Sequence, residues 1–164
     1  MLTKQDVQAI QRMIGNAVRK GMQEQNPEQI DNVRRDFFTY ESEALALAPA
    51  ASANDIINIE ADSDFILQKL TFEADIAAAT QTDSTRVVPL VTVQLIDSGS
   101  GRQMMQNPIP IPSIFGTGQL PLILPNPRKF LRNTTIQVAY TNFSAATTYN
   151  VRLAFIGYKI YNVQ

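Results

Sequence analysis

The side chains that most often carry out chemistry in proteins are scarce in this chain. Its 164 residues include no histidine and no cysteine, which excludes the usual catalytic triads, cysteine nucleophiles and the commonest zinc sites. Asp62 and Asp64 are two positions apart and would share one face of an extended segment, as in a glycosidase-like pair or a calcium site. Acidic residues in a turn are mostly solvated turn formers, and no further oxygen ligands follow these two in a loop pattern. We therefore expect no enzyme, no metal site and no cofactor.

Motifs for phosphate binding and for modification are equally weak. The chain contains neither GxGxxG nor GxxxxGK[ST], and SGSG at residues 98–101 predicts a turn rather than a phosphate cradle. Asn133 and Asn142 each begin a glycosylation sequon. Because the first residues lack the hydrophobic core of a signal peptide, we interpret both sequons as chance matches and expect folding in a cytoplasm.

The composition excludes further classes of partner. The net charge is −1 at pH 7, which argues against a general nucleic-acid binder. No apolar run approaches the roughly 18 residues that a membrane-spanning helix needs, so we expect neither nucleic acid nor membrane as a partner. Hydrophobic residues make up 45% of the chain and charged residues 18%, which is enough apolar surface to bury a core.

Residues 1–40 are predicted to form an N-terminal helical arm. Thr3 and Asp6 are placed as in a helix cap, and apolar residues then recur at intervals of three and four, which is typical of one helical stripe. The stripe consists of Val7, Ile10, Ile14, Ala17, Val18 and Met22. An isolated helix of this length is marginal in water, so the stripe must pack on its own domain or on a neighbouring molecule. A membrane surface is a third alternative, which the lack of Trp and Phe in the stripe disfavours.

A linker over residues 41–55 and a β-sandwich domain over residues 56–164 are predicted next. The linker is rich in Ala, Ser and acidic residues around Pro49, although its first part, residues 41–47, is also compatible with more helix. Beyond it, short alternating runs are separated by turn signals, with no amphipathic helices between them. The predicted strands are Ile56–Asp62, Phe65–Asp75, Arg86–Asp97, a short one opening at Arg102–Met105, Asn133–Ser144 and Thr147–Tyr161. This pattern predicts a mainly β, antiparallel sandwich or barrel.

An apolar, proline-rich stretch, NPIPIPSIFGTGQLPLILPNPRKF at residues 107–130, lies between two of these strands. Alternate prolines from Pro108 to Pro112 favour an extended, polyproline-type chain, and a short strand is predicted over residues 120–125. Such a segment can lie across an open end or face of the sandwich and cover its own core. The alternatives are a docking surface for a neighbouring subunit and, least favoured, a ligand groove.

Charge is divided unevenly along the chain. Residues 37–101 hold ten acidic and two basic side chains, whereas residues 102–164 hold six basic and no acidic side chains. Strands from the two segments that pair within one sandwich would bring opposite charges together. The alternative is that acidic and basic faces meet between protomers or on a partner.

The order of motifs in the C-terminal half resembles that of small virion proteins of tailed bacteriophages. The motifs are VTVQLIDSGSGRQM, the proline-rich stretch, NTTIQVAYTNFS and YNVRLAFIGYKIY, and the resemblance covers about residues 56–161. It implies an antiparallel jelly-roll-like β-sandwich used as a structural subunit, commonly a decoration or cement protein on the outside of the head. It also implies the major capsid protein or another virion protein as partner. We expect location in the virion and a homo-oligomer, with a trimer as our choice.

Contact residues are predicted in three groups. They are Val7, Ile10, Ile14 and Val18 in the arm, Ile109, Ile111, Ile114 and Phe115 in the proline-rich stretch, and the basic residues Arg128, Lys129 and Arg132. Two other functions stay open: a tail, neck or baseplate component, and a glycan-binding module for host attachment. Exposed tyrosines would serve the glycan-binding role, and the candidates are Tyr140, Tyr149, Tyr158 and Tyr161, although tyrosines on strands are mostly core or rim residues.

Overall fold

Alternation of apolar and polar residues gives nine strands in the part of the chain that the structure describes. The structure is a computed structural model, and it describes residues 33–77, 80 and 85–162. The elements are β1 (Val33–Leu47), β2 (Ser52–Asn58), β3 (Asp64–Ile76), β4 (Val91–Asp97), β5 (Arg102–Gln103), β6 (Ile109–Pro110), α2 (Ile111–Ile114), β7 (Leu122–Phe130), β8 (Thr135–Asn142) and β9 (Tyr149–Asn162). The prediction of a mainly β, antiparallel fold is confirmed.

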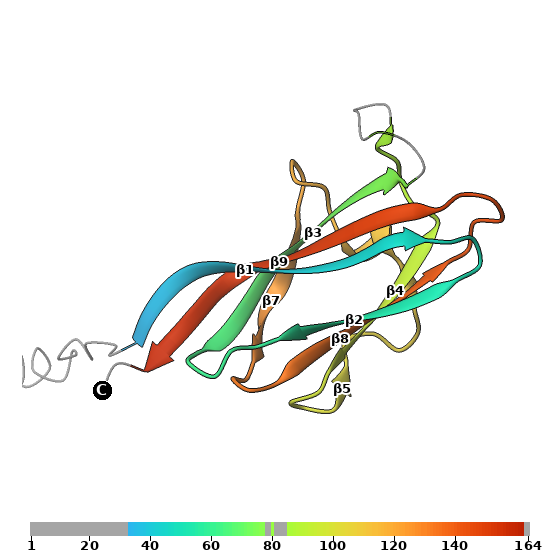
Figure 1. The fold of residues 1–164 in the computed structure, drawn as a ribbon. Coiled ribbons are helices and arrows are strands. Elements are labelled where there is room, and N and C mark those ends of the chain that lie inside the picture. Colours follow the sequence, from blue (N-terminus) through green and yellow to red (C-terminus); the bar gives the residue numbers. More distant parts are fainter. Residues whose placement is uncertain (1–32, 78–79, 81–84, 163–164) are drawn as a thin grey trace, which may run out of the picture. The chain divides into compact units, whose positions relative to one another are not determined.

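The strands form two antiparallel sheets (Figure 1). Sheet A has four strands in the order β1-β9-β3-β7, and sheet B has the order β2-β8-β4-β5, with β6 paired beside β4. The long β9 lies inside sheet A, where β1 pairs along one side of it and β3 along the other. Most connections cross from one sheet to the other, so both sheets enclose one core.

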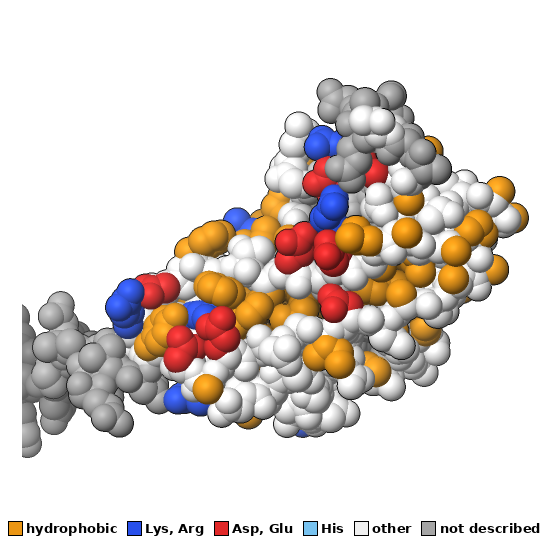
Figure 2. Space-filling model, in the orientation of Figure 1, with side chains coloured by type: hydrophobic (Ala, Val, Ile, Leu, Met, Phe, Trp, Pro, Cys, Tyr) orange, Lys and Arg blue, Asp and Glu red, His pale blue; other side chains and the backbone are white. Residues whose placement is uncertain are grey.

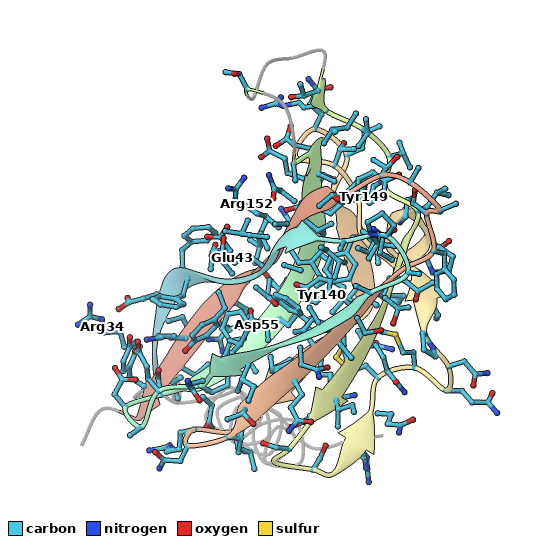
Figure 3. The ribbon with its side chains drawn as sticks, turned by 45° about the vertical axis from the view of Figure 1, so that its right-hand side comes forward. Arg34, Glu43, Asp55, Tyr140, Tyr149 and Arg152 are labelled. Carbon is cyan, nitrogen blue, oxygen red and sulfur yellow. The ribbon has the colours of Figure 1, made fainter. Side chains whose placement is uncertain are left out.

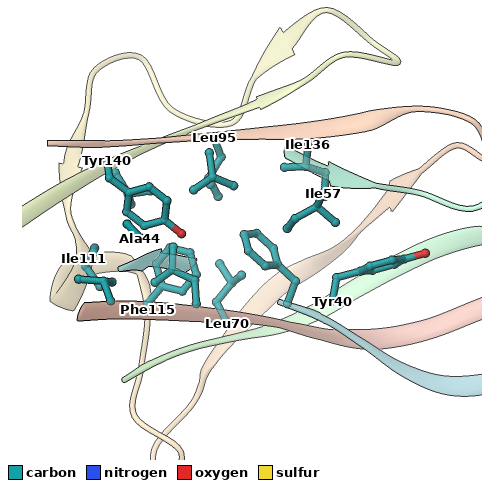
Figure 4. Close-up of a cluster of buried hydrophobic side chains, with 14 of the residues drawn as sticks. Tyr40, Ala44, Ile57, Leu70, Leu95, Ile111, Phe115, Ile136 and Tyr140 are labelled. Atoms are coloured by element: carbon teal, nitrogen blue, oxygen red, sulfur yellow. The ribbon is translucent and has the colours of Figure 1, made fainter. Parts of the chain in front are cut away.

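The core lies between the inward-facing sides of the two sheets (Figure 4). Burial alternates along the strands: Tyr149, Val151, Leu153 and Phe155, which share one face of β9, are all buried. Aromatic rings meet edge to face, with 4.9 Å between the ring centroids of Tyr40 and Phe65. Burial of each large apolar side chain stabilises the fold by about 1.5–3 kcal/mol before conformational entropy is counted.

Asn142, the last residue of β8, links the two sheets at one end of the core. It is 1% exposed, and its amide nitrogen donates to the carbonyl oxygens of Leu47, Ala48 and Thr147 at 2.9–3.0 Å. Its amide oxygen accepts from the backbone N–H of Ser144 at 2.8 Å. One buried side chain therefore satisfies backbone groups that the strand ends leave without ladder partners.

Lys159 of β9 closes the opposite end of the core. Its side chain is 4% exposed, its Nζ lies 3.9 Å from the centroid of the Phe38 ring, and it forms an ion pair with Glu60. Burial lowers the pKa of this ammonium group, but the hydrogen bond to Glu60 and nearby charges outweigh burial and raise the pKa above its usual value. The lysine therefore stays charged while its aliphatic chain covers aromatic rings.

The proline-rich stretch covers its own core, as one of the two main interpretations predicted. Ile111 is 0% exposed and Phe115 is 2% exposed, and the Phe115 ring lies 5.8 Å from that of Phe155. The stretch is less extended than expected, because α2 makes one helical turn after Pro110. Gly116 then runs beside β3, where a Cβ atom would come within 2.0 Å of the Leu120 carbonyl oxygen.

The boundaries of the helical arm and the linker need correction. Residues 33–40, expected in the arm, and residues 41–47, expected in the linker, form one strand that pairs with β9 from Val33 to Leu47. Ser52–Asn58 forms β2, so the expected linker contains part of a second strand. Ala and Glu favour a helix locally, but pairing with a distant strand outweighs such preferences. The arm before residue 33 lies outside the described residues.

Candidate docking surfaces

The three basic residues predicted to reach a partner all form ion pairs within the chain. Arg128 Nη2 lies 3.1 Å from Asp97 Oδ2, and Lys129 Nζ lies 2.7 Å from Asp64 Oδ2. Arg132 Nε lies 3.4 Å from Asp64 Oδ1. The interpretation that acidic and basic segments pair within the sandwich therefore accounts for these charges. Lys129 and Arg132 remain accessible, because their side chains are 53% and 40% exposed.

Hydrogen bonds hold the two aspartates ionised. Burial raises the pKa of Asp64, but hydrogen bonds from Lys129 and from the backbone N–H of Arg132 outweigh it, so the pKa lies below its usual value. Burial opposes ionisation of Asp97 too, whereas hydrogen bonds from Ser100, Arg128 and the Gly99 backbone lower its pKa overall. Each carboxylate fixes a loop and a basic side chain together.

The other predicted contact residues fall into three groups: residues buried in the core, half-buried residues, and residues outside the described part of the chain. Ile111 and Phe115 belong to the core, which corrects their assignment as partner contacts, because their side chains are not accessible. Ile109 and Ile114 are half-buried. The arm residues Val7, Ile10, Ile14 and Val18 lie outside the described residues. Among the tyrosines considered for glycan stacking, Tyr140 and Tyr149 are 0% and 6% exposed, so they cannot form an exposed platform.

A charged row crosses the outer face of sheet A, which also carries Phe37 at 77% exposure. Glu43 of β1, Arg152 of β9 and Glu73 of β3 lie side by side in register. Arg152 Nε is 3.6 Å from Glu43 Oε2, and the labelled pair lies close together across β1 and β9 (Figure 3). Glu73 continues the row by pairing with Arg86 at 3.0 Å. These side chains are about one-third to two-thirds exposed, so this row of the face is well suited to water.

The outer face of sheet B carries no charged side chain on its three long strands. Its outward-facing residues are Ser52, Asn54, Ile56 and Asn58 on β2, Thr135, Gln137, Ala139 and Thr141 on β8, and Thr92, Gln94 and Ile96 on β4. We call this set the sheet-B face. Its hydroxyl, amide and apolar groups resemble an interface core, where charged residues are depleted. Sequence reasoning missed this face, although the alternation in SANDIIN, VTVQLID and TIQVAYTN contains the signal.

Exposed hydrophobic side chains extend the sheet-B face at the end near Asn142. Phe143 and Leu90 are 65% and 62% exposed, and the Phe143 backbone N–H donates to the Leu90 carbonyl oxygen at 2.8 Å, so the two residues are neighbours. Three segments build this end, residues 44–54, 87–95 and 138–149. None of them contains a charged residue, because all their side chains are apolar or neutral polar. At the right-hand end of Figure 2, hydrophobic and uncharged atoms are seen without acidic or basic side chains.

A groove lies on another side of the sandwich, between β5 and β7. It encloses about 460 Å³. The lining residues are Asp97, Ser100, Arg102, Met104, Leu124, Asn126, Pro127, Arg128 and Lys129. β5 and β7 are the last strands of sheet B and sheet A in the strand orders, so the groove runs between two sheet edges. Arg102 was not among the predicted contact residues.

Among the described residues, no three acidic side chains gather closely enough to hold a metal ion, and no helix is long and apolar enough to cross a membrane. No family model matches the chain, and no curated protein matches it significantly.

Proposed function

We propose that this protein is a structural virion subunit of a tailed bacteriophage with a jelly-roll fold. The strand orders β1-β9-β3-β7 and β2-β8-β4-β5 support the fold, because alternate strands of one chain are divided between two sheets with the first and last strands adjacent. Viral jelly rolls typically divide eight strands between two sheets in this way, and here β6 adds a fifth strand to sheet B. The motifs that resemble small virion proteins form β4, the proline-rich stretch, β8 and β9.

The sheet-B face is the observation that carries the proposed role as an assembly subunit. An uncharged sheet surface beside exposed Leu90 and Phe143 loses less on desolvation than a charged one and gains from apolar burial. The charged outer face of sheet A would have to give up hydration of several ionised groups on contact with a partner. In the proposed arrangement the sheet-B face binds the major capsid protein from outside, and the subunit decorates and stabilises the shell.

The test is the copy number of the chain in the particle that carries it. Quantitative mass spectrometry against the major shell protein is expected to give a number comparable to that of the shell protein. A few copies per particle would instead assign it to the tail, neck or baseplate, where host attachment would again be considered. Absence from every particle would overturn the virion role.

A further inference from the structure

We propose that the groove between β5 and β7 binds an extended acidic peptide segment of a partner protein. Four basic side chains, Arg102, Arg128, Lys129 and Arg132, lie in or beside the groove, against only two carboxylates, Asp64 and Asp97. The cluster therefore has an excess of two positive charges. No acidic residue follows Asp97 in the sequence, so later strands add no carboxylate to reduce that excess.

The two aspartates order the cluster without neutralising it. Asp97 Oδ2 accepts from Arg128 at 3.1 Å and from the Ser100 hydroxyl at 2.6 Å, which fixes the turn between β4 and β5. Asp64 is shared by Lys129 and Arg132. Arg102 is exposed on β5 beside Asp97, and its guanidinium forms no ion pair with any other described residue. An arriving carboxylate therefore meets one arginine without a competing partner.

The remaining lining favours a peptide over a sugar or a nucleic acid. Met104, Leu124 and Pro127 supply apolar surface between the charges, which suits alternating acidic and apolar side chains on an extended chain. Thioether side chains such as that of Met104 adapt to varied apolar partners. Both flanking strands are sheet edges, a setting in which extended peptides are commonly captured. This inference rests on the proposed function in one respect: the acidic segment is taken to come from a second protein of the particle.

The test measures binding to the full chain by fluorescence anisotropy at low salt. The probe is a labelled peptide of about twelve residues in which aspartate alternates with leucine and alanine. A control peptide has asparagine in place of each aspartate. We expect the aspartate probe to bind at least about tenfold more tightly and to weaken with added salt. Arg102→Glu is expected to weaken that binding at least about tenfold, with Arg102→Gln between it and the unchanged chain.

Lys69→Glu provides the matched control, because Lys69 on β3 is not one of the residues that line the groove and forms no ion pair with another described residue. It makes the same charge change and is expected to leave the affinity nearly unchanged. Equal affinity for both probes, or equal loss with Lys69→Glu, would overturn the groove as an acidic-peptide site. Tighter, Arg102-dependent binding of a sulfated oligosaccharide or a short oligonucleotide would overturn the peptide class. None of these results alters the particle copy number, so the two proposals fail separately.

Discussion

The two sheets share one core but differ on their outer faces. Sheet A carries the row of Glu43, Arg152, Glu73 and Arg86 across its strands. The long strands of sheet B carry hydroxyl, amide and apolar groups in the corresponding positions. Both patterns satisfy the alternation that a half-buried sheet requires, so folding alone does not explain the difference. The proposed contact would explain it, because ionised groups lose more hydration free energy on burial than hydroxyl, amide and apolar groups do.

The largest expected effect comes from breaking the link between the sheets. Asn142→Leu keeps a similar side-chain volume but removes the donors to Leu47, Ala48 and Thr147 and the acceptor for Ser144. We expect it to lower the free energy of unfolding by about 3 kcal/mol or more, because buried backbone groups lose their partners. Urea unfolding measures this effect.

Gln137→Leu is the matched control for that experiment. It makes the same kind of polar-to-apolar change on the same strand, but Gln137 is exposed on the sheet-B face. We expect a change within about 0.5 kcal/mol. Similar losses in both variants would mean that Asn142 contributes no more than a surface amide, and that the sheets are held together by apolar packing alone.

The next effect tests the difference between the outer faces directly. Gln137→Lys places a charge at the centre of the sheet-B face, between Ile56 and Ile96 in register. If this face is buried against the shell, the unpaired ammonium should cost about 2 kcal/mol, or roughly 30-fold in affinity for the particle. Occupancy of purified particles at increasing subunit concentration measures it.

Thr39→Lys adds the same charge to the outer face of sheet A, where Thr39 is exposed opposite Ile156. It is expected to leave particle occupancy unchanged. The reverse result, with Thr39→Lys disruptive and Gln137→Lys harmless, would assign the contact to sheet A.

Much of this fold could be predicted from local patterns, but not its first strand. Alternating apolar residues predicted β3 and β9 well, because both strands have one side in the core. β1 was missed, because the Ala- and Glu-rich residues 41–47 favour helix or linker locally and become a strand only through pairing with β9. No local signal shows that a partner strand lies about a hundred residues away.

The candidate sites were less predictable than the fold for a related reason. Arg128, Lys129 and Arg132 are basic residues in a segment without acids, so they were expected to be available to a neighbour. Their carboxylate partners, Asp64 and Asp97, lie 31 to 68 positions earlier in the sequence, and only the packing of β7 against β3 brings Asp64 to Lys129. The burial of Ile111 and Phe115 likewise depends on where the proline-rich stretch crosses the core.

A smaller loss in the free energy of unfolding is expected at acidic pH. The folded-state pKa values of Asp64 and Asp97 lie below the usual value of 3.8. Their ionised forms therefore contribute stability that is fully present above that value and is lost as the pH falls through the lower folded-state values. Urea unfolding should show a decline below about pH 4, and Asp97→Asn should make that decline shallower.

Particle binding should respond to pH differently from stability if the sheet-B face is the contact. The outward-facing residues of β2, β4 and β8 include no titratable group, so this face contributes no change in affinity between about pH 5 and about pH 8. A steep change of affinity in that range, with stability constant, would indicate a contact made by charged groups elsewhere on the chain.

The smallest effect concerns the charged row itself. Arg152 and Glu43 side chains are 35% and 50% exposed, and their closest charged atoms are 3.6 Å apart. Ion pairs that remain this accessible contribute about 0–1 kcal/mol, because solvent screens them and two long side chains must be ordered. Arg152→Ala should therefore change the free energy of unfolding by less than about 1 kcal/mol, measured by urea unfolding at low and high salt. A larger loss that disappears in high salt would show that the charged row holds sheet A together, and its contrast with the sheet-B face would then concern folding rather than contact with a partner.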